Sequence, residues 1–359
     1  MKQSLAECLK NNMQHKHISL INLSIDRKLF EEGSGVALRF KEYAKQYKEI
    51  HVVVHTSPGF QFKKLADNVW IYPTNSKTKL GYFMDARKIG SEIIHKIKKT
   101  DTPASIQITS QDAFTHVVAI LLKRTYSIPI ELQYHTDFMS PYFRAESLKN
   151  RLRYCLYKWS LKKADAIRVV SSRIKKSIEG IVSEIPVRIE PVAVDKGRFN
   201  VSDEGAVINI KNKYPQFSFI FLIMSRLEKE KNIALALRSF KQVCVKYPKA
   251  GLVIVGSGSE LATLKKLARQ LNINDNVVFE GWVNDPSVYY KIADAFVLTT
   301  NYEGYGMTLV EANAAGLPII TTDVGIVGDV LVEPQILVCN VGDQDCFERN
   351  MLSLVARNV

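Results

Sequence analysis

The stretch TTNYEGYGMTLVEANAAGLPIITTD (299–323) decides the fold of this chain. An apolar run at Ala295–Leu298 predicts a strand directly before it. The quoted residues then predict a loop with two glycines, a helix at Thr308–Ala315 and a second strand at Pro318–Thr321. Because glycine lacks a side chain and a helix N-terminus favours negative charge, this loop is suited to bind a phosphate group. Strand, loop, helix and strand in this order form the repeating unit of a parallel α/β sheet.

The same alternation runs along the whole chain in two series of similar length. A turn-rich segment, PVAVDKGRFNVSDEG (191–205), separates them. We therefore predict an α/β protein with two doubly wound, Rossmann-like domains that face a central cleft. The N-terminal domain spans 1–198, with 1–15 as a short amphipathic extension, and the C-terminal domain spans 199–359. Ligands of such sheets bind outside the carboxyl ends of the strands, so the cleft is the expected site.

The charge of the 359 residues is unevenly distributed. Lys and Arg number 49 against 36 Asp and Glu, which gives a net charge of +13. Residues 1–200 carry 34 basic and 19 acidic side chains, whereas residues 201–359 carry 15 and 17. This asymmetry indicates that the first domain meets an anionic partner. Since the sequence shows no zinc finger, basic recognition helix or RNA-binding aromatic signature, membrane lipid or a phosphorylated substrate is favoured over nucleic acid.

The cysteines and the apolar runs indicate the compartment. The five cysteines include no CxxC pair, which predicts reduced thiols in place of disulfides or a zinc site. The longest apolar runs, such as FSFIFLIM (217–224), are shorter than the roughly 18 residues that span a bilayer. The N-terminus lacks the continuous apolar region of a secretory signal. We expect a cytoplasmic protein without a transmembrane helix.

Two further turns in the second half carry residues suited to a ligand. SRLEKEKN (225–232) follows a predicted strand and presents Arg226 and Lys231, whose charges suit a diphosphate, at a helix entry. The interleaved Glu228 and Glu230 leave a solvated turn as the alternative.

VIVGSGS (253–259) places Gly256 and Gly258 between a strand and a helix. The third glycine of a dinucleotide fingerprint would stand where the chain has Leu261. A nicotinamide cofactor is therefore disfavoured, even though Glu280 lies about 20 residues further on. Close approach to a nucleotide or sugar and a plain glycine turn both stay open.

Glu303 lies in the glycine loop and Glu311 lies inside the following helix, so both can point into one cleft. Two glutamates at this spacing usually mark a solvated face. Glu311 nevertheless interrupts an otherwise apolar helix, where a carboxylate needs a partner.

These motifs resemble, in order and spacing, the donor-binding domain of the retaining glycosyltransferases of family 4, the group 1 enzymes with the GT-B fold. The resemblance runs from Phe219 to about Val330 and rests on SRLEKEKN, VGSGSE, FEGW, ADAFVLTT and EGYGMTLVEANAAGLPIITTDVG. The first half is similar through GSGVALRFKEYAKQYKEIHVVV (33–54) and QYHTDF (133–138), although its loop is GSG and not the usual paired glycines. Family members generally continue to a helix that crosses back onto the first domain, which we expect to be shortened or absent here.

The resemblance implies transfer of a glycosyl group from a UDP- or GDP-sugar to an acceptor hydroxyl, with retention at the anomeric carbon. The product would belong to a cell-surface polysaccharide or glycolipid. No metal ion would be needed, and there would be no cofactor besides the donor substrate, because side chains and backbone N–H groups would stabilise the leaving diphosphate. A sugar-nucleotide epimerase or phosphorylase is the alternative class, and a nucleic-acid-binding protein a more distant one.

The resemblance also implies roles for single residues. Glu303 would hold the donor sugar, Glu311 would bind the ribose hydroxyls, and His135 would reach the sugar near the reacting carbon. A structural histidine is the alternative for His135, and Asp112 would line the acceptor side or cap a helix. The catalytic residues would be His135 and Glu303, and the substrate-binding residues Gly33, Ser34, Gly35, Arg226, Lys231, Gly256, Gly258, Gly304, Tyr305, Gly306, Met307, Thr308 and Glu311.

The segment from Ser147 to Ala164 has six basic residues and no acid. An apolar stripe recurs there at helical spacing, so we expect it to pack on the sheet and the charges to face outward. Beside the apolar loop DFMSPYF (137–143), such a helix is typical of a surface that meets anionic lipid. This favours a lipid-linked or glycan acceptor and peripheral contact with the inner face of a membrane, with a solvated basic face as the alternative. The stripe is Leu148, Leu152, Cys155, Leu156 and Trp159.

Overall fold

The computed structural model describes residues 16–99, 105–192, 194, 197–200, 204–331 and 336–358. Tertiary contacts divide the chain into two units. The first contains the chain up to Phe138 together with Lys149–Val169 and Ser177–Ile189, and the second contains Met139–Leu148, Val170–Lys176 and Glu190 onward. The domain boundary at 198 stays a prediction, and the extension at 1–15 lies outside the described residues.

The first unit is built on a mainly parallel sheet. In its described part, eight strands lie in the order β3-β4-β2-β1-β5-β6-β7-β8, and only β3 runs antiparallel to its neighbour. The strands β1, β2 and β6 are almost wholly buried, as expected where helices cover both faces of a parallel sheet. The bounds are β1 Ser19–Ser24, β2 Glu49–Val54, β3 Lys63–Ala66, β4 Val69–Pro73, β5 Ile106–Ser110, β6 Ile130–Tyr134, β7 Ala166–Val169 and β8 Val187–Ile189.

Short polar residues begin two of the helices beside this sheet. The Ser34 hydroxyl accepts a hydrogen bond from the Ala37 N–H and caps α2. Asp112 caps α4 in a capping box with Thr115. The helical elements of this half of the chain are η1 Arg27–Phe30, α2 Gly35–Ala44, α3 Gly81–Lys98, α4 Ala113–Tyr126, α5 Pro141–Glu146, α6 Leu148–Leu161 and α7 Ser172–Ile178.

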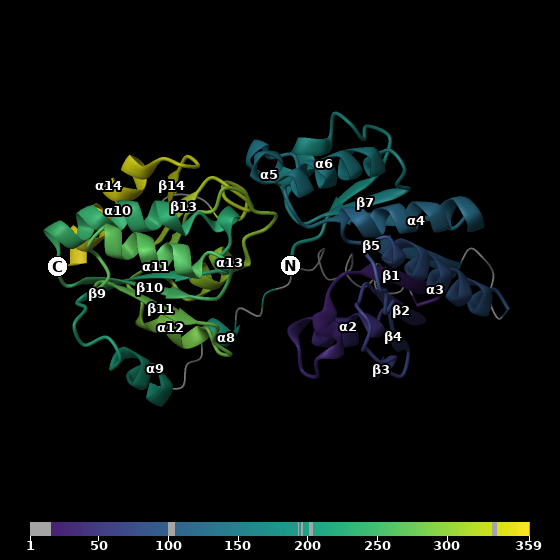
Figure 1. Cartoon of the computed structure of the whole chain (residues 1–359), viewed down its shortest axis with the longest axis horizontal. Helices are drawn as coiled ribbons and strands as arrows, with labels where there is room; N and C mark the ends of the chain where they lie inside the picture. The colour runs from purple at the N-terminus through teal and green to yellow at the C-terminus, as the bar shows by residue number, and fades with distance from the viewer. Residues whose placement is uncertain are drawn as a thin grey trace, which may run out of the picture. The chain divides into compact units, whose positions relative to one another are not determined.

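The second unit has a fully parallel sheet. Within residues 204–331 and 336–358, six strands lie in the order β11-β10-β9-β12-β13-β14. Figure 1 shows α10 and α11 over one face of this sheet and α8 and α12 on the other, and each face has its own buried apolar cluster. The strands are β9 Phe219–Met224, β10 Ala250–Val255, β11 Val277–Gly281, β12 Ala295–Leu298, β13 Ile319–Thr322 and β14 Ile336–Cys339. The helical elements are α8 Gly197–Asn200, α9 Glu204–Lys211, η3 Lys229–Lys231, α10 Ile233–Lys246, α11 Leu261–Gln270, α12 Ser287–Ile292, α13 Met307–Ala314 and α14 Gln344–Asn358.

Both units are therefore doubly wound, which confirms the predicted class of two Rossmann-like domains. None of the helices described is long and apolar enough to cross a membrane.

Helix α6 is turned the opposite way from the prediction. Its residues Leu148, Leu152 and Trp159 are 79%, 53% and 42% exposed, and Cys155 is exposed as well. The expectation that this stripe packs on the sheet is wrong.

The face of α6 that packs inward is mainly polar and aromatic, and Leu161 is its one buried aliphatic residue. The Ser160 hydroxyl lies 3.0 Å from the Tyr134 hydroxyl and 3.2 Å from Nδ1 of His116. Tyr157 is buried, and its ring contacts those of His116 and Tyr134. These hydrogen bonds and ring contacts favour burying this face, and they outweigh the apolar periodicity of the helix.

The cysteines differ from the prediction as well. Cys339, at the end of β14, forms a disulfide with Cys346 in α14. Cys155 and Cys244 are free. The expectation of reduced thiols is wrong for the bonded pair, because the chain reverses between β14 and α14 and brings together two cysteines that no familiar spacing links.

Candidate functional site

The site of the second unit lies where the order of its strands reverses. From β9 the chain moves outward through β10 and β11, and then returns to the other side of β9 with β12. The loops after β9 and β12 therefore leave neighbouring strands at the same edge of the sheet. Such a switch point is where open parallel sheets bind ligands.

Hydrogen bonds join these two loops. The Asn301 N–H donates to the Glu230 carbonyl over 2.7 Å, and the Thr300 hydroxyl donates to the same oxygen over 2.9 Å. The Thr299 hydroxyl donates to the carbonyl of Asn232 over 3.0 Å. Asn232 adopts the left-handed conformation that ends η3. The turn after β9 is thus held on the end of β12.

The predicted residues Lys231 and Glu303 form an ion pair across this junction. Their side chains are only 11% and 18% exposed, so water screens the pair weakly. The pair places one cation and one hydrogen-bond acceptor side by side at the switch point.

Arg226 has a different environment. Its side chain is 67% exposed and donates to Glu230 over 2.7 Å. The structure therefore brings Lys231 into a fixed position and leaves Arg226 on the surface of the same turn.

The glycine loop is held by backbone contacts on the far side of Glu303. The Ile326 N–H donates to the Tyr305 carbonyl over 3.0 Å, and the Ser171 hydroxyl donates to the Gly304 carbonyl over 2.8 Å. A Cβ on Gly325 would lie 2.3 Å from the Tyr305 oxygen, so only glycine allows this approach. The loop is rigid enough to present backbone groups in one arrangement.

Gly306, Met307 and Thr308 begin helix α13. Gly306 is the N-cap, with φ of 95°, and has no side chain to satisfy the first N–H groups of the helix. The first turn thus directs backbone donors and the positive end of the helix dipole at the loop. These are the backbone groups that we expect, from the sequence, to bind a phosphate.

Glu311 has the partner that its apolar helix demands. The buried hydroxyl of Tyr290, on α12, donates to its carboxylate over 2.8 Å. Burial and the adjacent carboxylate raise the pKa of Tyr290 well above its usual value, so the phenol keeps its proton and remains a donor.

Gly256 and Gly258 have a packing role. A Cβ on Gly256 would lie 1.9 Å from the Ser225 oxygen, and one on Gly258 would lie 2.3 Å from the Leu227 oxygen. The turn after β10 therefore needs glycine to pack on the segment that carries Arg226, which favours the plain-turn alternative over ligand contact.

Glu280 is likewise held by the protein. The hydroxyl of Tyr214 donates to it over 2.6 Å and that of Tyr289 over 3.0 Å. Burial raises the pKa of Glu280, but these hydrogen bonds outweigh it and keep that pKa below the usual value. A carboxylate engaged in this way does not act as the ribose-binding acid of a dinucleotide site.

In the first unit, His135 follows β6 and is half-buried. Its Nε2 lies 3.2 Å from Oε1 of Gln133, and Nε2 of Gln133 lies 2.7 Å from the Thr109 hydroxyl. Since Gln133 donates through its nitrogen, its oxygen accepts, which assigns the proton of neutral His135 to Nε2. Burial, with the charges of Arg168 and Arg39, lowers the pKa of His135 to about 4.

The loop Gly33–Gly35 is open to solvent. Gly33 has φ of 71°, and a Cβ there would meet nothing within 4 Å. The Ser34 hydroxyl also donates to the Lys28 carbonyl over 2.6 Å, so this side chain holds the loop in shape. What the loop can offer a ligand is its backbone at the start of α2.

The Asp112 side chain caps helix α4 and does not line an open surface. It is buried, caps α4 and forms an ion pair with Arg153. Of its two predicted alternatives, the structure supports the helix cap.

Three residues that hold the site in place by hydrogen bonds were not predicted from the sequence. Ser171 braces Gly304, Tyr290 orients Glu311, and Arg173 donates to the Gly325 carbonyl over 3.3 Å and forms an ion pair with Asp323. Ser171 and Arg173 lie more than a hundred residues before their partners in the chain, and Tyr290 has the pattern of an ordinary core aromatic. In the described ranges, no group of three or more His, Cys, Asp or Glu could hold a metal ion.

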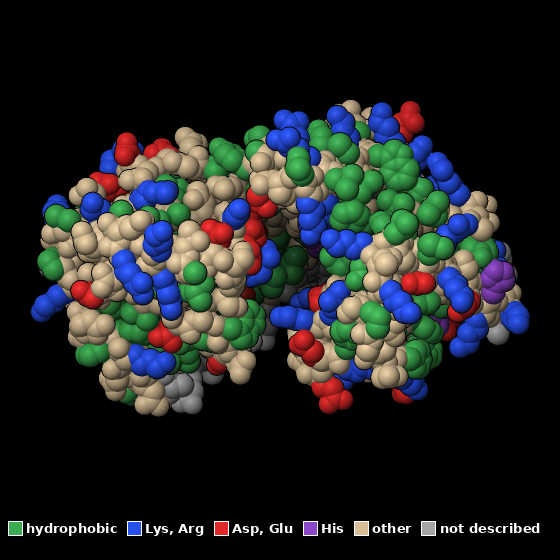
Figure 2. Space-filling model, in the orientation of Figure 1, with side chains coloured by type: hydrophobic (Ala, Val, Ile, Leu, Met, Phe, Trp, Pro, Cys, Tyr) green, Lys and Arg blue, Asp and Glu red, His purple; other side chains and the backbone are tan. Residues whose placement is uncertain are grey.

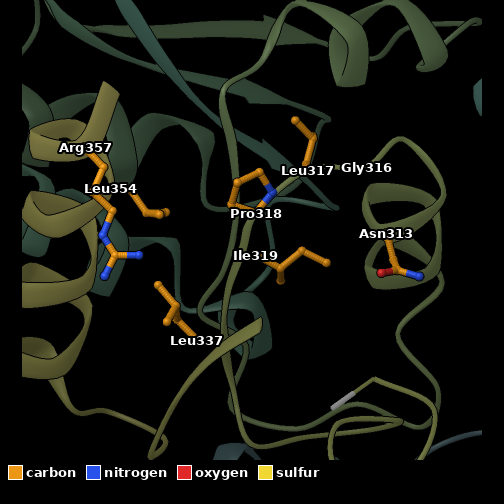
Figure 3. Close-up of a pocket in the computed structure, with 8 residues that line it drawn as sticks. All are labelled: Asn313, Gly316, Leu317, Pro318, Ile319, Leu337, Leu354 and Arg357. Carbon is orange, nitrogen blue, oxygen red and sulfur yellow. The ribbon is translucent and has the colours of Figure 1, made fainter. Parts of the chain in front are cut away.

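A cavity of roughly 600 Å³ lies elsewhere on the second unit (Figure 3). Ile319 and Leu337 stand at the amino ends of β13 and β14, opposite the edge that carries the switch point. The close-up shows side chains of α13, β13, β14 and α14 around this space. The cavity is thus separate from the Lys231–Glu303 site. Its lining residues are Asn313, Gly316, Leu317, Pro318, Ile319, Leu337, Leu354 and Arg357.

Comparison with known proteins relates part of the second unit to a family. Residues 208–358 match the family model described as glycosyl transferases group 1. This part of the chain is therefore similar to the group 1 glycosyltransferases. The match does not name family 4.

Curated relatives agree with this family. An uncharacterized glycosyltransferase of Methanocaldococcus jannaschii is 32% identical over 182 residues, which are 50% of this chain and 44% of that protein. Alpha-monoglucosyldiacylglycerol synthase of Streptococcus pneumoniae is 24% identical over 67% of this chain and 56% of its own length. The chain thus spans about half the length of these relatives.

Solved structures share the fold across both units. Sucrose-phosphate synthase from Thermosynechococcus elongatus superposes with a TM-score of 0.77 at 18% identity, covering 95% of this chain and 90% of that one. Anabaena HepE in complex with UDP and glucose gives 0.71 at 16% identity, covering 95% and 91%. At these identities the likeness establishes the GT-B fold and nothing finer.

Proposed function

We propose that this protein is a retaining glycosyltransferase that moves a sugar from a UDP- or GDP-sugar to an acceptor hydroxyl. The observation that carries the proposal is the Lys231–Glu303 pair at the switch point of a group 1 glycosyltransferase domain. It sets a cation for a diphosphate beside an acceptor for sugar hydroxyls, which are the two chemistries that a nucleotide sugar combines.

The main chemical task is to stabilise negative charge on the leaving diphosphate. Lys231 supplies a nearly buried positive charge, Arg226 a planar guanidinium on the same turn, and Met307 and Thr308 the backbone donors of a helix N-terminus. We propose that these groups suffice without a metal ion, and that the donor sugar nucleotide is needed with no further cofactor.

The sugar and ribose hydroxyls of the donor donate hydrogen bonds to two carboxylates. Glu303 accepts hydrogen bonds from hydroxyls of the transferred sugar, and Glu311, held by Tyr290, accepts those of the ribose. Each carboxylate already has one protein partner, so it is oriented before the substrate arrives.

In the first unit, His135 and the loop Gly33–Gly35 complete the proposal through the family resemblance. With its pKa lowered to about 4, His135 is neutral at physiological pH and acts as a hydrogen-bonding group near the reacting carbon. The backbone of Gly33–Gly35 approaches the phosphates or the acceptor.

The acceptor we propose is a lipid-linked or otherwise phosphorylated glycan acceptor, in the synthesis of a cell-surface polysaccharide or glycolipid. The excess of basic residues in 1–200 supports an anionic acceptor, and the name of the pneumococcal relative supports a glycolipid. We place the reaction at the cytoplasmic face of a membrane.

A panel of nucleotide sugars tests the donor. UDP- and GDP-sugars are screened for thermal stabilisation, and the product of the best donor is analysed by NMR for the configuration of the new bond. Lys231→Ala should abolish stabilisation by the donor, whereas Lys229→Ala, an exposed lysine of the same short helix, should leave it intact. Release of an epimerised sugar nucleotide without acceptor would assign the protein to the epimerases instead.

The metal is tested in the same assay. We expect unchanged turnover with EDTA. Complete loss that manganese restores would refute the metal-independent mechanism.

A further inference from the structure

Helix α6 carries an apolar stripe that faces solvent. We define the α6 stripe as Leu148, Leu152, Cys155 and Trp159. The steps between them are four, three and four residues, so at about 100° per residue they form one line along the helix. All four are exposed, and Leu148 and Leu152 keep 79% and 53% of their surface in contact with solvent.

Turning the stripe inward would break contacts that hold the opposite face of α6. The opposite face of α6 is fixed by Ser160, which contacts Tyr134 and His116, and by the ion pair of Arg153 with Asp112. Rotating the helix to bury the leucines would expose or break these contacts and leave buried polar groups unsatisfied. The outward position of the stripe is therefore a property of the fold.

Basic residues border the stripe. Arg151 and Lys158 lie along one side of it, Lys149 lies on the other, and Lys162 follows just beyond the helix; all four are exposed. No acidic residue occurs between Ser147 and Ala164. Figure 2 shows hydrophobic side chains gathered beside Lys and Arg over the region where Figure 1 labels α6.

We propose that the α6 stripe docks the protein on an anionic lipid bilayer. Leucine and tryptophan side chains enter the boundary between headgroups and acyl chains, while the bordering cations contact anionic headgroups. A straight ridge of exposed side chains suits the flat, deformable surface of a bilayer, and the bordering cations select an anionic one. The stripe would bring the protein to the surface that holds the lipid-linked acceptor, so the inference deepens the acceptor proposal and rests on it for its biological purpose.

Co-flotation with liposomes tests the docking. Purified protein is mixed at low salt with vesicles of phosphatidylcholine alone, or of phosphatidylcholine with 30% phosphatidylglycerol. We expect co-flotation with the phosphatidylglycerol vesicles and at least tenfold less with the neutral ones, with binding that weakens as salt rises. Equal binding to both vesicles, or binding to neither, would overturn the proposal.

Matched variants assign the binding to the stripe. Leu148→Asp with Leu152→Asp should reduce vesicle binding at least tenfold, whereas Val245→Asp, which places the same charge at a 71% exposed site on α10, should not. Lys158→Gln with Lys162→Gln should reduce binding by roughly 30-fold. Lys241→Gln with Lys266→Gln, two exposed lysines of the second unit, should change it by less than twofold.

Two further measurements distinguish a contact with lipid from a contact between copies of the chain. Bromolipid vesicles should quench the fluorescence of Trp159, and Trp159→Phe should remove that part of the quenching. If the stripe variants instead convert a dimer to a monomer and leave vesicle binding unchanged, the stripe is an interface between copies, and the proposal fails. None of these measurements involves sugar transfer, so a protein that binds vesicles and transfers nothing would refute only the proposed function.

Discussion

Removing one member of the Lys231–Glu303 pair should affect stability and transfer in separable ways. Glu303→Ala leaves the ammonium group of Lys231, which is 11% exposed, without its carboxylate. Breaking a fully buried pair costs about 3–5 kcal/mol, and an exposed pair contributes about 0–1 kcal/mol. With partners 11% and 18% exposed, we expect a loss of about 1–3 kcal/mol. For a domain of this size that lowers the unfolding temperature by roughly 2–10 °C.

A double-mutant cycle tests the reasoning. Because the two side chains share one interaction, Lys231→Ala combined with Glu303→Ala should destabilise the protein less than the sum of the single variants, by about 1–2 kcal/mol. The rate of sugar transfer should not recover in the double variant as the stability does. Each single variant should lose about 10²–10³-fold in turnover, and the double variant should stay inactive although its stability partly recovers.

The surface pair Arg226–Glu230 is the control for stability. Its arginine is 67% exposed, so Glu230→Ala should cost less than about 1 kcal/mol. Calorimetry or denaturant unfolding gives the stabilities, and release of nucleoside diphosphate gives the turnover. Near-normal turnover of Lys231→Ala or Glu303→Ala would refute the site. Strictly additive stabilities would show that the contact contributes nothing to the fold.

Three other outcomes follow from the same structure. Gly258→Ala places a Cβ 2.3 Å from the Leu227 oxygen and should cost about 3 kcal/mol or more in unfolding free energy, whereas Gly316→Ala, where a Cβ meets nothing, should cost about 1 kcal/mol from its positive φ alone. Burial lowers the pKa values of His55, His116 and His135 to about 4, so the unfolded chain binds more protons below pH 6.5. Denaturant unfolding should show stability falling as the pH drops from about 6.5 to about 4 and then no further loss from these groups; pH-independent stability in that window would contradict it. Reducing the Cys339–Cys346 disulfide should lower stability by about 2–3 kcal/mol through loop-closure entropy, and Cys346→Ser should make stability insensitive to reductant.

The strands and turns that depend only on neighbouring residues were predicted from the sequence. The apolar runs before Arg226 and before the glycine loop became β9 and β12, because a buried parallel strand needs little more than such a run. The loop and helix after β12 followed from glycine and from the start of an apolar periodic segment. That Lys231 and Glu303 meet required only the order of the strands, since neighbouring parallel strands end at the same edge.

Contacts between segments that are far apart in the sequence could not be predicted from local patterns. Nothing in the residues around Ser171 or Arg173 indicates that they brace the loop near Gly304 and Gly325, because the hydrogen bonds form only after both segments have folded. The same holds for Cys339 and Cys346, which a reversal of the chain brings together. Sequence spacing describes neighbours along one element and not partners between elements.

Helix α6 shows how the apolar pattern alone misleads. Its leucines suggested a core face, yet the core of this region is closed by Tyr134, Tyr157, Ser160 and His116, which contact one another. A cluster joined by hydrogen bonds and ring contacts can occupy an interior, and once it does, the apolar side chains must face out. The misassigned face is therefore itself informative, because an exposed apolar stripe that the fold enforces needs a functional reason.

The distribution of charge gains a physical interpretation from these contacts. In the second unit the two cations proposed to meet the donor are already paired, Lys231 with Glu303 and Arg226 with Glu230. A diphosphate arriving there exchanges one anionic partner for another, so the domain needs no excess charge, and residues 201–359 have 15 basic and 17 acidic side chains. The cations along α6 have no acid in their own segment to balance them. Of these cations, Arg153 pairs with Asp112. The exposed Lys149, Arg151, Lys158 and Lys162 border the α6 stripe, where their positive charge attracts an anionic partner.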